Sequence, residues 1–106
     1  MNLEEQFDTL AKEWRETAGL YSMWNGMRRQ AAAQKLVDLG KPVVPLILKT
    51  LETDKWIAWS QLLCEITGTR PDYQPDKVAG GGFVAINVKD FAQAWIDWGK
   101  ANGYTI

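Results

Sequence analysis

Histidine is absent from this sequence, and cysteine occurs once, as Cys64. Without histidine the chain lacks the commonest general base and the commonest metal ligand, and it cannot form a Ser-His or Cys-His nucleophile pair. A single cysteine cannot form an internal disulfide, and it leaves structural zinc without a ligand set. We therefore predict that the protein is not an enzyme and has no catalytic residues, no metal and no cofactor.

Long apolar runs are also missing. The longest, residues 43–48, is interrupted by Pro45 and is far shorter than the roughly 18 to 20 residues that span a bilayer. The opening Met-Asn-Leu-Glu-Glu has neither the basic region nor the apolar region of a secretory signal. These absences predict a cytoplasmic protein in a reducing setting, without membrane contact.

Charge is nearly balanced, with a formal net charge of −1, which argues against polyanion binding by the molecule as a whole. Its distribution is uneven. Residues 1–19 contain five acidic and two basic side chains, whereas residues 20–60 contain six basic and three acidic ones. The amino-terminal part is therefore acidic and the middle of the chain is basic.

Tryptophan is the residue type in excess, with six in 106 residues. Each indole side chain can bury on the order of 200 Å², so a compact core is easily built. The length matches the commonest domain size, and no linker divides the chain. We predict a single domain over residues 1–106.

Five helices are predicted from apolar side chains at three-and-four spacing and from the glycine and proline residues that bound them. They cover about 3–17, 26–39, 42–52, 54–67 and 88–102. Thr53 or Asp54 is expected to cap the fourth helix, which is apolar on several sides and is therefore placed at the centre. Residues 20–26 are expected to form an aromatic-bearing connection. Residues 69–86 are expected to form a long glycine-rich loop, with an extended segment at 83–86.

Residues 36–68 have the pattern of one helical hairpin, with a Gly40-Lys41-Pro42 turn and a stop at Gly68. Together with Ile66-Thr67-Gly68 and Trp95-Ile96-Asp97-Trp98-Gly99, this pattern resembles a group of small uncharacterised bacterial proteins that are HEAT-like in their middle portion. The resemblance covers about residues 34–104. It implies an all-α, right-handed HEAT-like stack of five helices, made of two hairpins and a carboxy-terminal helix, and it brings no catalytic residues.

A short phrase occurs twice, as Trp56-Ile57-Ala58-Trp59 and as Trp95-Ile96-Asp97-Trp98. Helical spacing places both indoles of each pair on one side. Two interpretations stay open, a packed aromatic core and a half-open pocket for a peptide or planar ligand. Glu65 and Asp97 lie beside these tryptophans. A carboxylate there either has a raised pKa, as a ligand-binding or weakly catalytic site would use, or pairs with Arg70, or faces solvent.

The preferred function is a protein–protein interaction module, an inhibitor, antitoxin or adaptor from a bacterium or phage that acts by occupying a partner's surface. The contact surface is predicted at the 21–29 edge or at the 80–86 loop. The candidate partner-binding residues are Tyr21, Trp24, Arg28, Arg29 and Phe83. The oligomeric state is not indicated by the sequence.

Two alternatives remain. In the first, a basic stripe binds nucleic acid while Tyr21 and Trp24 stack on bases. The stripe comprises Arg28, Arg29, Lys35, Lys41 and Lys49. In the second, the aromatic pocket binds a small ligand, lined by Trp56, Trp59, Trp95 and Trp98.

Overall fold

The structure is a computed structural model that describes residues 2–21, 23–71, 76–77, 84–85 and 88–104. The helices within these residues are α1 (Leu3–Ala18), α2 (Trp24–Arg28), α3 (Ala31–Leu39), α4 (Val44–Leu51), α5 (Ile57–Thr67) and α6 (Val88–Ala101), and a 3₁₀ turn, η1 (Lys41–Val43), precedes α4. The predicted long loop contains an antiparallel pair of two-residue strands, β1 (Asp76–Lys77) and β2 (Val84–Ala85), in which Asp76 pairs with Ala85. Apart from this pair the described elements are helical, which confirms the all-α class.

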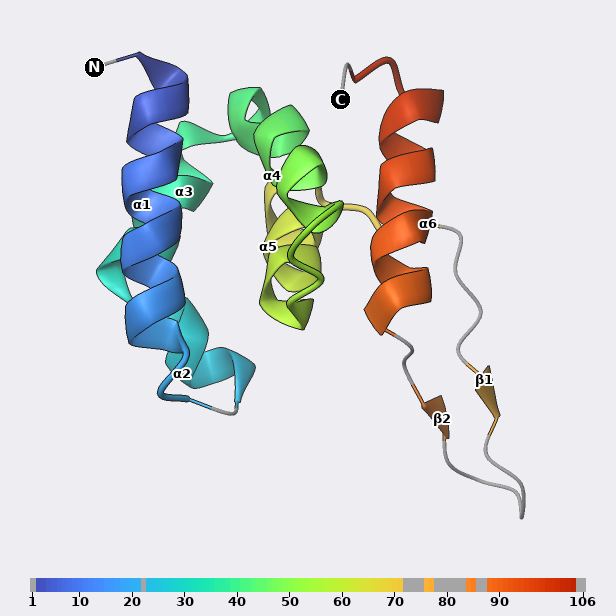
Figure 1. Ribbon diagram of the computed structural model, residues 1–106, viewed down its shortest axis with the longest axis horizontal. Coiled ribbons are helices and arrows are strands. Elements are labelled where there is room, and N and C mark those ends of the chain that lie inside the picture. The colour runs from blue at the N-terminus through green and yellow to red at the C-terminus, as the bar shows by residue number, and fades with distance from the viewer. Residues whose placement is uncertain (1, 22, 72–75, 78–83, 86–87, 105–106) are drawn as a thin grey trace.

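The helices form layers (Figure 1). On one side α1 lies against α3, with α2 across their lower end. In the middle α4 packs on α5, and α6 packs against both from the other side. The α5 helix also contacts α2 and α3, so it lies at the centre, as its wide apolar arc predicted.

The start of α1 follows from local chemistry. The side-chain oxygen of Asn2 accepts a hydrogen bond from the backbone N–H of Glu5 at 2.9 Å, which satisfies a free donor at the helix start. Glu4 and Glu5 lie in the first turn, where the helix dipole favours negative charge. Phe7 and Trp14 are buried on one face, as the predicted apolar stripe requires.

The predicted second helix, 26–39, is wrong, because it is two helices and the described chain therefore contains six rather than five. The first, α2, begins earlier, at Trp24, and the chain turns to an extended conformation at Gln30 before α3. A tertiary hydrogen bond lies at the break, where the Met27 carbonyl also accepts from the N–H of Gln30 at 3.3 Å. The indole N–H of Trp14 donates to the carbonyl of Met27 at 2.8 Å, whereas in a continuous helix that carbonyl would accept from Ala31.

Glycine residues lie at the ends of helices and proline residues at their starts, as predicted from the sequence. Gly40 and Gly68 follow the ends of α3 and α5 with φ of 72° and 69°, a left-handed backbone that favours glycine. Pro42 lies in η1 and Pro45 in the first turn of α4, where a missing N–H is tolerated.

The predicted cap of α5 is wrong. The residue before its first turn is Trp56, whose side chain makes no capping hydrogen bond. Asp54 instead forms a turn, because its side chain accepts from the backbone N–H of Trp56 at 3.3 Å and from the indole N–H of Trp59 at 3.1 Å. No helix in the described part of the chain is both long enough and apolar enough to cross a membrane.

Candidate functional site

Four of the five predicted partner-binding residues gather around α2. Trp24 and Arg28 belong to the helix, Arg29 follows it, and Tyr21 precedes it. Phe83 lies outside the described residues. The edge predicted at 21–29 is therefore one small region at the lower end of α1 and α3 (Figure 1).

Three exposed apolar side chains mark the connection between α1 and α2, which we call the α1–α2 corner: Leu20, Tyr21 and Met23. Their side chains are 84%, 46% and 70% exposed. Among the described residues, Val88 is the other large apolar side chain that is exposed. Apolar groups gathered at one place on a surface are typical of interaction sites, whereas single ones are common everywhere.

Backbone contacts hold this corner in place. The N–H of Tyr21 donates to the carbonyl of Ala18 at 3.0 Å, and the N–H of Gly26 donates to that of Met23 at 3.1 Å. A Cβ atom on Gly26 would lie 2.7 Å from Cδ1 of Tyr21, so the tyrosine ring rests directly on the α2 backbone. Glycine at this position lets α2 and the ring approach each other.

A groove of about 360 Å³ opens between α2 and the carboxy-terminal half of α5, which we call the α2–α5 groove. It is lined by Trp24, Gln61, Cys64, Glu65, Gly68, Thr69 and Arg70. Trp24 is half-buried, with its ring edge-on to Trp14 at a centroid distance of 6.2 Å. Trp24 follows Met23 of the corner directly in the sequence.

Arg28 is bound to Glu65 beside this groove. Its Nε donates to both carboxylate oxygens, at 2.8 and 2.7 Å, and a terminal nitrogen donates to Gln34 at 2.9 Å. The hydrogen bond to Glu65 raises the pKa of the Arg28 guanidinium, partly opposed by burial. The partner of Glu65 is thus Arg28, and not Arg70, which was one of the alternatives from the sequence.

Cys64 and Arg70 are the remaining polar features of the groove. The thiol is half-buried; burial raises the pKa of Cys64, while the positive charge of Arg70 opposes this rise. A protonated thiol is a weak nucleophile, so Cys64 should react slowly near neutral pH. Arg70 is exposed and makes no ion pair with any residue in the described part of the chain.

The other basic residues of the predicted stripe are dispersed. Lys35 lines a groove of about 360 Å³ between α1 and α3, together with Leu10 and Leu39. Lys49 lines a different groove, between α1 and α4. Arg28 is bound to Glu65, so of these three bases one is compensated and the other two line different grooves.

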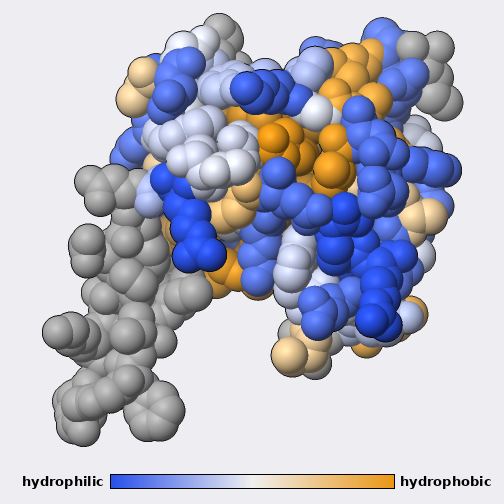
Figure 2. All heavy atoms as spheres, turned by 180° about the vertical axis from the view of Figure 1, so that it is seen from behind, coloured by the Kyte–Doolittle hydropathy of each residue, from blue (hydrophilic) through white to orange (hydrophobic). Residues whose placement is uncertain are grey.

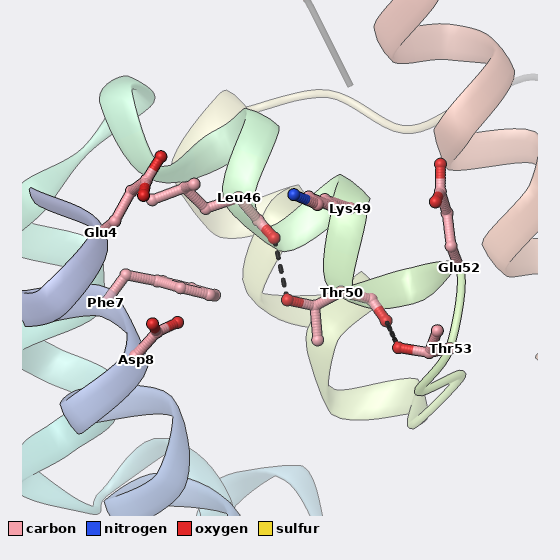
Figure 3. A pocket seen from close by; sticks show the side chains of 8 residues that line it. All are labelled: Glu4, Phe7, Asp8, Leu46, Lys49, Thr50, Glu52 and Thr53. Atoms are coloured by element: carbon pink, nitrogen blue, oxygen red, sulfur yellow. Dashed lines mark hydrogen bonds between the residues drawn. The ribbon is translucent and has the colours of Figure 1, made fainter.

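The α1–α4 groove, of about 370 Å³, was not predicted (Figure 3). It is lined by Glu4, Phe7, Asp8, Leu46, Lys49, Thr50, Glu52 and Thr53. Figure 3 shows the α1 side chains projecting toward α4, and the hydroxyls of Thr50 and Thr53 donate to backbone carbonyls. Three carboxylates face one ammonium here. Among the described residues no group of three or more Asp, Glu, His or Cys could hold a metal ion.

The two tryptophan pairs lie in separate clusters. Trp56 and Trp59 join Phe7, Trp14 and Trp24 across α1, α2 and α5, whereas Trp95 and Trp98 contact Tyr104. Trp59 is 1% exposed and Trp95 0%, and the other two are half-buried. None of the four lines the three grooves described above.

The face opposite to the view of Figure 1 carries both apolar and hydrophilic side chains. Figure 2 shows apolar side chains gathered in its upper half, with hydrophilic residues around them. This area is therefore interrupted by polar neighbours.

Comparison with known proteins gives no family assignment: no family model, no curated protein and no solved structure matches the chain. The predicted resemblance to HEAT-like bacterial proteins stays a prediction.

Proposed function

We propose that this protein is a non-enzymatic interaction module that occupies the surface of a partner protein through the α1–α2 corner. The observation that carries the proposal is the exposure of Leu20 and Met23, at 84% and 70%. Side chains of this kind bury area readily when a partner covers them, because apolar surface contributes about 25 cal/mol per Å² removed from water.

Hydrogen bonds of the described residues on both sides of the corner support the proposal. Leu20 and Met23 project from a connection whose backbone is hydrogen-bonded to α1 and α2. The following helix is anchored by Met27, which is buried and whose carbonyl accepts the indole N–H of Trp14. An apolar surface on an ordered support loses little conformational entropy on binding.

The nucleic-acid alternative is less well supported. Its central base, Arg28, is bound to Glu65 and Gln34, and Lys35 and Lys49 line different grooves. Binding driven by phosphates needs several uncompensated cations on one surface. The small-ligand alternative is weakened by the burial of Trp59 and Trp95 in the core.

The proposal also covers the scaffold, the biological role and the location of the protein. We propose a HEAT-like right-handed stack as the scaffold, a role as inhibitor, antitoxin or adaptor, and a cytoplasmic location in a bacterium or phage. A layered helical scaffold supports this assignment because it presents an extended surface for docking.

The test is a double substitution, Leu20→Ser with Met23→Ser, compared with Val88→Ser as a control that removes an exposed apolar side chain (44%) elsewhere. A photo-crosslinking residue is also placed at position 20 or 88. In native lysate we expect a defined cross-linked partner from position 20 and a loss of its co-purification of about tenfold or more in the double variant. Both variants should keep the thermal melt. The same products from both positions, or undiminished capture by the double variant, would contradict the proposal.

A further inference from the structure

We infer that the α2–α5 groove receives an acidic segment of the partner protein, with Arg70 binding its carboxylate and Trp24 packing against the apolar residue beside it. This inference rests on the proposed function, because it names the chemistry of the partner that covers the α1–α2 corner. The two surfaces are linked along the chain, because Met23 of the corner is followed directly by Trp24 of the groove.

The charges of the groove point to an anionic group. Its lining includes two ionic side chains, Glu65 and Arg70. Glu65 is neutralised by Arg28, which contacts both of its oxygens at 2.8 Å or less. The thiol of Cys64 is uncharged near neutral pH.

The remaining charge is therefore one guanidinium, that of Arg70, without an ion-pair partner among the described residues. A guanidinium offers planar paired donors that fit a carboxylate.

The shape of the groove suits an acidic side chain of the partner together with the residue next to it. The half-buried Trp24 forms an apolar wall, held edge-on against the buried Trp14. The opposite wall is the α5 face with Gln61 and Cys64, followed by Thr69. An acidic residue next to an apolar one would place its carboxylate near Arg70 and its neighbour on the indole.

A protein segment fits these features better than a nucleic acid. One free guanidinium contacts one anionic group, whereas a phosphate backbone presents a charge at every nucleotide and is bound by several cations. The formal net charge of −1 adds no general attraction. Nucleic-acid binding is accordingly an outcome that the test can detect.

The experiment is selection from a displayed library of random 12-residue peptides, run in parallel on the wild-type protein, Arg70→Gln and Lys100→Gln. Lys100 is an exposed base in the last turn of α6 and serves as the matched control. We expect wild type and Lys100→Gln to enrich peptides with Asp or Glu beside an apolar residue, and Arg70→Gln to lose this acidic preference. An acidic peptide selected on wild type should bind Arg70→Gln about three- to tenfold more weakly.

Cys64 reports where the peptide binds. As the one cysteine of the chain and part of the groove lining, it can be alkylated with iodoacetamide with and without the selected peptide. Bound peptide should slow the alkylation in proportion to the fraction of protein occupied. An unchanged alkylation rate at saturation would place the peptide elsewhere and overturn the inference.

The outcomes separate this inference from the proposed function. Peptides that bind through Leu20 and Met23 without acidic preference would overturn the inference alone. No enriched peptide on any variant, together with no cross-linked partner from position 20, would overturn both. Salt-sensitive binding of a 20-nucleotide poly(dT) that requires Arg70 would overturn the inference in favour of a nucleic-acid site.

Discussion

The two tryptophan pairs, Trp56 with Trp59 and Trp95 with Trp98, have similar local sequences but different surroundings in the structure. At the start of α5, Trp56 and Trp59 lie within a cluster that joins three helices, and Trp14 is 4.9 Å from Trp56 and 5.1 Å from Trp59 between ring centroids. On α6, Trp95 and Trp98 meet edge to face at 5.3 Å, and Trp98 stacks on Tyr104 just beyond the same helix.

The polar contacts of the two clusters differ more than their packing. In the first, the indole N–H groups of Trp14 and Trp59 donate to Met27 and Asp54. The Arg15 guanidinium lies 4.4 Å from the centroid of the Trp56 ring and also pairs with Asp54 at 3.4 Å.

In the second, the buried Nε1 of Trp95 finds no acceptor within the described part of the chain. Among the described residues, indole N–H hydrogen bonds thus support the α5 cluster, whereas the buried Trp95 of the α6 cluster has none.

The largest expected effect is that of Trp14→Ala. Removing the fully buried ring at the centre of the first cluster should lower the free energy of unfolding by about 3–5 kcal/mol. Urea unfolding followed by circular dichroism measures it, with Trp98→Ala as the comparison. Trp98 is half-buried, so its loss should cost clearly less; equal losses would remove the distinction between the clusters.

A subtler pair of variants isolates the indole N–H. Trp14→Phe and Trp95→Phe both shrink a fully buried ring, but among the described residues the first alone removes a hydrogen bond, that to the Met27 carbonyl. The first should therefore lose about 1–3 kcal/mol more stability than the second, measured by the same urea titration. If Trp95→Phe proved the costlier change, the N–H of Trp95 would have an acceptor after all.

The acidic residues near the two tryptophan pairs, Glu65 and Asp97, should differ less in their effect on stability. Glu65 on α5 bonds to Arg28 on α2, whereas Asp97 on α6 accepts from Gln93 of its own helix. Glu65→Gln should cost up to about 1 kcal/mol and lose that effect at high salt, while Asp97→Asn should be nearly neutral. Thermal melts at low and high ionic strength test both, and a costlier Asp97→Asn would reverse the expected order.

The smallest effect concerns the thiol on α5. Burial raises the pKa of Cys64 in the folded protein above its unfolded value. Its contribution to stability is therefore present below the unfolded pKa and is lost as the pH rises through the folded one. Alkylation of the folded protein should show a midpoint at higher pH than in concentrated urea. Coincident midpoints would mean that the thiol is as well solvated folded as unfolded.

Much of the fold could be predicted from the sequence, because a helix that packs on one side has apolar residues at three-and-four spacing along the chain. The stripe with Phe7 and Trp14, the stops at Gly40 and Gly68 and the central position of α5 were all predicted. The break at Gln30 was not, and it lies beside a bond from Trp14 to Met27, thirteen residues away. A contact between residues this far apart in the sequence cannot be predicted from the spacing of neighbouring residues.

The candidate site was predictable in part. Tyr21 and Trp24 stood out as aromatics in a connection, but Leu20 and Met23 were overlooked, although apolar residues after the Gly19 helix stop were an available signal. The pairing of Glu65 with Arg28 joins α5 to α2 across 37 positions and depends on the tertiary arrangement. The acidic groove between α1 and α4 likewise arises only when two distant segments meet.

The closeness of the indoles also has an optical consequence. Trp14, Trp24, Trp56 and Trp59 are linked by ring contacts of 4.9 to 6.2 Å, so excitation absorbed by one ring passes readily to the others. Trp24 forms a wall of the α2–α5 groove. A quencher carried into that groove should therefore dim the ultraviolet emission of buried rings that it never touches.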